Sequence, residues 1–170
     1  MCGRFAITLP ADAVAGLFDA AIGDLPPQEP RYNVCPTQPV MTVRSAEDGR
    51  WLETMRWGFL PRWYRSPSDG PLLINARAET IAEKPAFRSS CRKRRCLIPA
   101  SGFYEWTKAA DGGKDPWYTF PADSEIFALA GIWRDWESPD GNVWSTCAIV
   151  TCPAMGELSG IHTRMPVIIG

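Results

Sequence analysis

A chain of 170 residues, of which 45% are hydrophobic and 22% are charged, has the length and balance of one globular domain. This composition excludes disordered and collagen-like chains. The formal net charge of -1 argues against a strongly basic nucleic-acid binder of the histone type. It leaves room for a local basic groove, because the electrostatic field depends on where the charges lie.

The first half of the chain predicts one helix and one hairpin. Apolar residues recur at helical spacing behind Pro10, which favours a first helical turn. The segment Ala46-Glu47-Asp48-Gly49 is a turn signal between two strand patterns. The predicted elements are a helix within residues 10–20, a hairpin of strands 40–44 and 51–57, a short strand at 72–75 and helical turns within 78–87.

The second half is more clearly β. Strand patterns recur at regular spacing, with Asp111-Gly112-Gly113 and Asp140-Gly141-Asn142 as turn signals. This organisation indicates an α+β fold, a single domain of curved antiparallel β-sheets that form a pseudo-barrel with a few flanking helices. The predicted strands are residues 96–99, 102–108, 117–120, 126–135 and 143–151, and a helical turn is predicted within 153–159.

The chain shows no sign of a membrane segment or a metal site. No apolar run approaches the roughly 20 residues that a spanning helix needs, and no secretory segment follows the start. We therefore expect no membrane partner and a cytoplasmic or nucleoid-associated protein, with its six cysteines reduced. The cysteines form no Cys-x-x-Cys pair, so we expect no metal ion and no cofactor.

The N-terminus carries the first chemically distinctive residue. Cys2 is small enough for methionine aminopeptidase to remove Met1, after which the chain would begin with a 1,2-aminothiol. The α-amine of such a terminus is partly neutral at about pH 7 to 8 and can attack an aldehyde to give an imine. The thiol can then close a five-membered thiazolidine ring. The alternative is a cysteine that merely follows Met1.

Two internal segments combine polar groups with a strand. Asn75, Arg77 and Glu79 place an amide, a cation and a carboxylate after a short strand, where they can orient a substrate and clamp a phosphate. A structural role in the loop is equally consistent. In a separate aromatic strand, alternation puts Phe103 and Glu105 on one face. A carboxylate that is partly desolvated there suits proton transfer, whereas an exposed one would be structural.

The only histidine, His162, lies two residues before Arg164. Strand alternation would place both side chains on one face, as a pair for proton transfer and phosphate binding. A histidine with a purely structural role is the alternative.

Two basic segments indicate nucleic acid. Residues 88–95 hold five cations and no acid, although a solvated basic face would look the same. Residues 56–65 interleave arginines with aromatic rings, which provide stacking faces beside phosphate contacts, as binding of a single strand requires.

Together and in this order, these segments closely resemble the SRAP (SOS response-associated peptidase) family. The family usually continues beyond the histidine segment, whereas this chain ends eight residues after His162, so the resemblance implies one SRAP domain over 1–170 that is truncated at its C-terminus. The matching segments are residues 1–5, 31–34 with Pro36, 57–58 with Pro61 and Trp63, 74–77 with 79–80, 102–106, and His162 with Arg164 and Pro166.

The resemblance implies a reaction and a partner. Members of the family bind abasic sites in single-stranded DNA during the DNA damage (SOS) response and crosslink to the sugar aldehyde through the N-terminal cysteine. The product is a thiazolidine, and the family is also described as removing its own first methionine. A monomer that acts on single-stranded DNA with abasic sites is therefore expected.

The resemblance also implies roles for individual residues. Cys2 supplies the amine and the thiol, and Asn75 orients them. Glu105 is the general acid and base, and His162 assists proton transfer and reversal of the crosslink. The implied DNA contacts are Arg4, Arg77 and Arg164 at phosphates, and Pro36, Trp63 and Tyr64 in a wedge that excludes a continuous duplex.

Two other functions fit the same residues. A cysteine peptidase or amidase of the N-terminal-nucleophile kind would use Cys2 to attack a carbonyl and would act on peptides without DNA. A non-catalytic module for single-stranded DNA would keep its affinity after Cys2→Ala and form no covalent product.

Overall fold

The hairpin predicted from strands 40–44 and 51–57 forms two neighbouring strands of the larger sheet. In the computed structural model, which describes residues 2–170, strands β4 (Pro39–Ala46) and β5 (Gly49–Trp57) pair antiparallel. The turn between them brings Ala46 opposite Gly49, which has a φ of 130°. Glycine adopts this left-handed conformation without the steric penalty of a Cβ atom. The hairpin prediction is confirmed.

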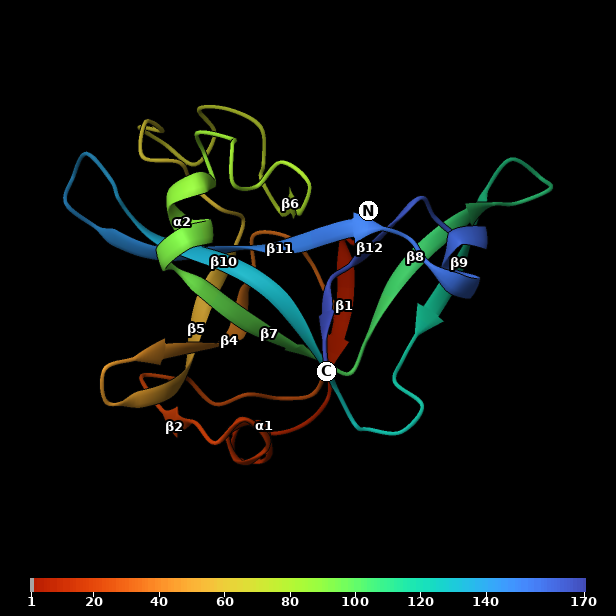
Figure 1. The fold of residues 1–170 in the computed structure, drawn as a ribbon, viewed down its shortest axis with the longest axis horizontal. Helices are drawn as coiled ribbons and strands as arrows, with labels where there is room; N and C mark the ends of the chain where they lie inside the picture. Colours follow the sequence, from red (N-terminus) through yellow and green to blue (C-terminus); the bar gives the residue numbers. More distant parts are fainter. Residues whose placement is uncertain (1) are drawn as a thin grey trace.

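The larger sheet closes into a barrel. Strands β7 (Arg95–Ala100), β10 (Phe127–Glu137) and β11 (Val143–Pro153) continue the hairpin in the order β5-β4-β7-β10-β11. A parallel pairing of Cys147 in β11 with Trp57 in β5 then joins the two ends, so five strands form a closed ring (Figure 1). Closure removes exposed strand edges. The predicted α+β pseudo-barrel is confirmed.

The barrel interior is filled by apolar side chains of all five strands. Leu52, Ile98, Leu129 and Ile149 are fully buried, and burying each such side chain contributes about 1.5–3 kcal/mol. Trp57 connects this core to the rest of the molecule. Its ring packs 5.2 Å from that of Phe5, and its Nε1 donates a hydrogen bond to the carbonyl of Ile74 at 3.0 Å.

A second, four-stranded sheet carries the N-terminus. Its order is β3 (Arg31–Val34), β1 (Arg4–Ile7), β8 (Gly102–Lys108) and β9 (Lys114–Thr119). Pro116 is tolerated because β9 lies at the edge of this sheet, where a missing N–H costs no ladder bond. Sequence patterns did not predict β1 or β3, because Phe5, Ala6 and Ile7 are all buried and give no alternation.

The remaining elements are short. The strand expected at 72–75 forms at 75–77, which differs from the prediction. The helical turns expected within 78–87 are present as hydrogen-bonded turns, for example from the N–H of Lys84 to the carbonyl of Thr80, and a regular helix begins at Arg88. Pro85 accounts for the late helix, since a proline disfavours helical backbone in the residue before it. No helix within residues 2–170 is long and apolar enough to cross a membrane. These elements are α1 (Ala11–Phe18), β2 (Ala21–Ile22), β6 (Asn75–Arg77), α2 (Arg88–Lys93), the 3-10 helix η1 (Gly156–Gly160), β12 (Arg164–Pro166) and β13 (Ile168–Ile169).

Candidate active site at the N-terminal cysteine

Strand pairing brings Cys2 next to the aromatic strand that carries Glu105. β1 and β8 run antiparallel with Arg4 opposite Tyr104, so the residues before Arg4 lie beside those after Tyr104. Cys2 is 0% exposed. The prediction that Met1 is removed concerns a residue outside those described.

Asn75 anchors the start of the chain. β6 pairs in parallel with β11, where Asn75 lies opposite Ile149, and Ala76 is buried on the other face of the strand. The side-chain amide donates a hydrogen bond from Nδ2 to the carbonyl oxygen of Cys2 at 3.1 Å. Among the described residues, the Oδ1 atom of Asn75 is buried and has no hydrogen-bond partner. A buried acceptor in this state costs about 1–3 kcal/mol and is available to a donor at the site.

The side chain of Glu105, in β8, lies close to that of His162. Glu105 is only 7% exposed and shares its strand face with Phe103, as alternation predicted. The rings of Tyr104 and Trp106 lie on the opposite face, 6.3 Å apart. The Oε2 atom of Glu105 is 3.9 Å from Nε2 of His162. This separation is longer than a hydrogen bond, and the contact becomes an ion pair only when the imidazole is protonated.

The backbone of Arg164 orients the ring of His162. The N–H group of Arg164 donates to Nδ1 of His162 at 3.0 Å. Nδ1 also lies 3.2 Å from the carbonyl oxygen of Arg164, so the backbone of Arg164 holds this edge of the ring in either tautomer and Nε2 faces Glu105. The prediction that the two side chains share one strand face is wrong, since β12 begins at Arg164 and His162 lies in the preceding turn.

The environment of Cys2 favours the neutral thiol. Burial, and secondly the negative charge of Glu105, raise the pKa of the Cys2 thiol to about 12. The sulfur therefore keeps its proton near neutral pH and needs a base to release it as it reacts.

Of the three predicted phosphate contacts, Arg164 and Arg4 already make side-chain bonds within the protein. The guanidinium group of Arg164 holds both carboxylate oxygens of Glu79, at 2.7 and 2.9 Å, and also donates to the carbonyl of Thr151. This bond lowers the pKa of Glu79 to about 2. Arg77 is exposed, and alternation places it on the same side of β6 as Asn75. Arg4 donates to Oδ1 of Asn33 at 3.2 Å.

The predicted wedge residues differ in exposure. Trp63 is 58% exposed and Pro36 is half-buried, whereas Tyr64 is 8% exposed. The hydroxyl of Tyr64 donates to the carbonyl of Pro71, and its ring packs edge-on against Trp63. A buried ring has no free face for a base. The hydroxyl and the ring of Tyr64 are thus engaged within the protein, and its contact with DNA stays a prediction.

Two clefts open beside these residues, and Trp106 and Lys114 line both. Sequence analysis assigned neither residue to the site, and the glycine turn between β8 and β9 was the only signal for the position of Lys114. The larger cleft, of about 540 Å³, is lined by Glu105, Trp106, Thr107, Lys108, Gly112, Gly113, Lys114 and His162. The smaller, of about 280 Å³, is lined by Gly3, Arg4, Trp106 and Lys114.

The four residues predicted to be catalytic thus come from four separate segments. Cys2, Asn75, Glu105 and His162 meet at the junction of the barrel and the smaller sheet. They define a protein of the α+β class that could use an N-terminal cysteine as its nucleophile. Within residues 2–170, no group of three or more His, Cys, Asp or Glu side chains is placed to hold a metal ion.

Comparison with known proteins agrees with this class. The family model described as SOS response associated peptidase (SRAP) matches residues 1–170, and the chain belongs to this family. The resemblance inferred from the sequence is confirmed.

Individual relatives are similar along nearly the whole chain. YoqW of Bacillus subtilis (strain 168), named an abasic site processing protein, is 38% identical over 172 residues, which cover 99% of this chain and 76% of the relative. YedK of Escherichia coli (strain K12), which carries the same descriptive name, is 32% identical over 99% of this chain and 75% of its own. A solved structure from Bacteroides thetaiotaomicron has a TM-score of 0.86 at 27% identity, covering 99% of this chain and 77% of that one.

Proposed function

We propose that this protein processes abasic sites in single-stranded DNA by forming a covalent bond between Cys2 and the aldehyde of the ring-opened sugar. The observation that carries the proposal is the hydrogen bond that fixes Cys2 to Asn75, beside the buried Glu105 and the partly exposed His162. The descriptive names of YoqW and YedK support the same substrate.

The chemistry needs only groups that the chain supplies. Once Met1 is removed, the neutral amine of Cys2 attacks the aldehyde carbon, and the resulting hydroxyl leaves as water to give an imine. The sulfur then adds to the imine carbon, and the thiol proton ends on the nitrogen. One C–N and one C–S bond form, one C=O bond is lost, and the net change is the loss of one water molecule.

Glu105 transfers the protons in these steps. Its carboxylate takes a proton from the attacking amine and returns it to the departing hydroxyl, and later accepts the proton of the thiol. That base is required because burial keeps the Cys2 thiol protonated, with a pKa of about 12. Nε2 of His162 faces this carboxylate and assists in moving its proton. The same two groups, acting in reverse, open the ring and release the crosslink.

The proposed DNA contacts are made by side chains that are at least partly exposed to solvent. Arg4 and Arg77 bind phosphates next to the lesion, and Trp63 offers a ring face at which a base can stack. Pro36 forms the wedge together with Trp63, and Tyr64 supports Trp63 from behind. Arg164 positions His162 through its backbone and contacts a phosphate only if it releases Glu79.

Removal of Met1 by the protein itself is part of the proposal. The description of the matching family as a peptidase supports it. The thiol of Cys2 attacks the carbonyl carbon of Met1, and the C–N bond to Cys2 breaks as Glu105 passes the thiol proton to the leaving amine. Water then hydrolyses the resulting thioester, which releases methionine and restores the thiol. The acid and base groups at this site would thus act twice.

The test is a denaturing gel of protein mixed with a single-stranded oligonucleotide that carries one abasic site. A shifted, heat-stable band is expected for wild type and none for Cys2→Ser, which keeps the amine but cannot close a sulfur ring. The same oligonucleotide with an intact base should give no band. A band of equal strength from Cys2→Ser would show that the covalent product is not a thiazolidine. If wild type bound the oligonucleotide but gave no covalent band, the protein would be a non-catalytic module that binds single-stranded DNA.

A further inference from the structure

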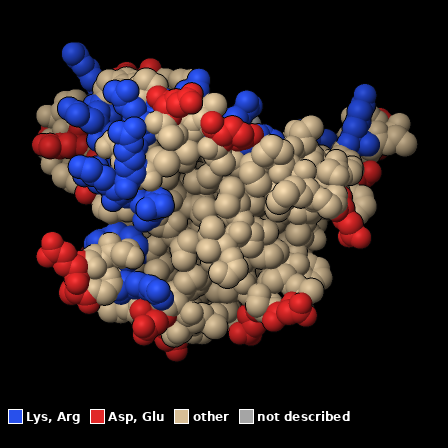
Figure 2. All heavy atoms as spheres, in the orientation of Figure 1, with Lys and Arg blue, Asp and Glu red and all other residues tan. Residues whose placement is uncertain are grey.

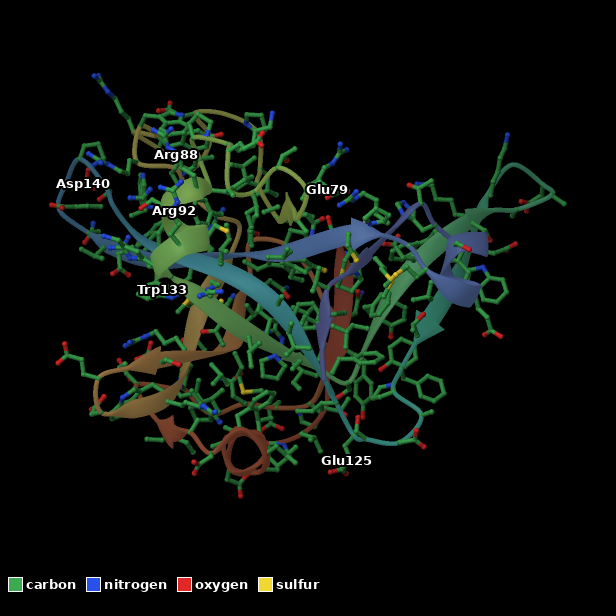
Figure 3. All side chains as sticks on the ribbon, viewed as in Figure 1. Glu79, Arg88, Arg92, Glu125, Trp133 and Asp140 are labelled. Carbon is green, nitrogen blue, oxygen red and sulfur yellow. The ribbon has the colours of Figure 1, made fainter. Side chains whose placement is uncertain are left out.

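A basic surface outside the site described above runs over helix α2. Figure 2 shows Lys and Arg side chains gathered in a stripe over this helix, and Figure 3 places Arg88 and Arg92 on it above Trp133. Next to the stripe lies a cleft of about 430 Å³, here called the α2 basic cleft. It is lined by Arg62, Trp63, Pro85, Ala86, Arg88, Ser89 and Arg134.

No carboxylate among residues 2–170 lies within ion-pair distance of a cation of the α2 basic cleft, although the charge of Asp135 acts on Arg134. The ion pairs among residues 2–170 are Arg44 with Glu53, His162 with Glu105 and Arg164 with Glu79, so none involves a cation of this cleft. Burial, and then the positive charges of Arg94 and Arg62, lower the pKa of Arg134. Like charges held this close repel one another, and an anion between them would remove that cost.

The chemistry of the cleft indicates a nucleic-acid backbone. Arg62 comes from the loop after β5, Arg88 from α2 and Arg134 from β10, so three independent segments direct guanidinium groups to one place. A single guanidinium group can donate hydrogen bonds to two phosphate oxygens at once. The exposed indole of Trp63 borders the same cleft and provides a stacking face for a base. An acidic peptide would use the cations but would not need the indole.

We propose that the α2 basic cleft binds the phosphodiester backbone of the DNA substrate beyond Trp63, several nucleotides from the abasic sugar. The cleft shares no lining residue with the two clefts around Cys2 and Glu105, so it is a separate subsite. Arg94, which lies 5.8 Å over the ring of Trp133, extends the cationic surface along β10. This inference rests on the proposed function, because it takes the same DNA as its ligand.

The first experiment measures binding without chemistry. Fluorescence anisotropy on an undamaged single strand of about 20 nucleotides, at several salt concentrations, compares wild type with Arg62→Gln/Arg88→Gln. The double variant is expected to bind on the order of tenfold more weakly, with a salt slope shallower by about 0.7 for each phosphate that it no longer binds. Arg50→Gln, an exposed site at the far end of the β5 hairpin, is the matched control and should bind as wild type. Equal affinity and slope for wild type and the double variant would overturn the proposal.

The second experiment locates the subsite relative to the lesion. Two abasic oligonucleotides carry their long flank on either the 5′ or the 3′ side, and the DNA concentration for half-maximal crosslinking is measured for each. The double variant should need more DNA for one flank and not for the other. Equal increases for both flanks would mean a general field effect and would contradict a defined subsite. If wild type gave no crosslink, the proposed function would fail, while the anisotropy experiment would still decide whether the cleft binds DNA.

Discussion

The carboxylate of Glu105 is the group proposed to transfer the protons in every step of the reaction. Replacing it by glutamine keeps the shape of the side chain but removes its capacity for proton transfer. We expect Glu105→Gln to slow crosslinking by about 10²- to 10⁴-fold, the usual contribution of general acid–base catalysis. Single-turnover rates at saturating DNA measure this. Glu125→Gln, at an exposed position shown in Figure 3, is the control with the same charge change. Unchanged crosslinking rates in Glu105→Gln would show that the carboxylate of Glu105 does not act as the general acid and base.

At the residue scale, sequence reasoning succeeded where one strand decides the answer. Alternation alone placed Glu105 and Phe103 on one face of β8, and the structure shows that this face is buried. It failed for His162 because the ring is held by a backbone N–H of the next strand, which no spacing of side chains reveals. It did not foresee the burial of Tyr64, because an aromatic side chain fits a stacking ring and a core residue equally well.

Among the elements, β6 and β12 are coupled through Glu79 and Arg164. Glu79 follows β6 and Arg164 begins β12, and both strands pair with β11 (Figure 3 labels Glu79). The ion pair therefore connects the strand that carries Asn75 to the strand that follows His162. It thereby links two of the four site residues, and the backbone of Arg164 also contacts the ring of His162 directly.

Breaking this pair should be visible in the pH dependence of stability. Arg164 lowers the pKa of Glu79 from 4.5 to about 2, so the pair stabilises the fold above about pH 4.5, and this contribution is lost as the pH falls towards 2. We expect Glu79→Gln to melt at a lower temperature than wild type at pH 7, with the difference shrinking between pH 4.5 and 2. Thermal melts monitored by circular dichroism measure this, with Glu83→Gln in the same turn region as control. A difference that stays constant with pH would show that the ion pair does not stabilise the fold.

Element boundaries were predicted where turns and alternation coincide. The β4–β5 hairpin carries both signals and was found within a few residues. β3 is mostly exposed, with only Val34 buried, and β6 spans three residues, so neither gives a pattern. Both strands form because a neighbouring strand supplies hydrogen-bond partners, which is a tertiary effect.

For the whole molecule, the barrel interior sets the response to alkaline pH. Burial raises the pKa of Cys96 in β7 to about 12 and that of Cys147 in β11 well above 9.0. The folded protein keeps both protons above pH 9, whereas the unfolded chain releases them. Stability should therefore fall by up to about 1.4 kcal/mol per pH unit for each thiol. Melting temperatures between pH 8 and 10.5 in reductant test this. Cys96→Ala should flatten the decline, and Cys35→Ala in the loop before β4 should not. Equal slopes in both variants would contradict this explanation.

The class of the fold followed from the spacing of the strands, but the closure of the barrel did not. Regular turn signals in the second half indicated antiparallel sheets, and these formed. The parallel contact of Cys147 with Trp57 joins strands far apart in the sequence, and no local pattern encodes it. That contact also places Trp57, which bonds to the carbonyl of Ile74 just before Asn75. The convergence of the site residues is thus a property of the closed barrel.

Covalent capture of the abasic sugar by Cys2 is the step on which every proposed role at the site depends. Intact-mass spectrometry of the purified protein, mixed with a single-stranded abasic oligonucleotide, detects that step without any label. We expect one species at the sum of the two masses, less one water and without Met1. A chain shown to begin at Cys2 that forms no adduct would contradict covalent capture.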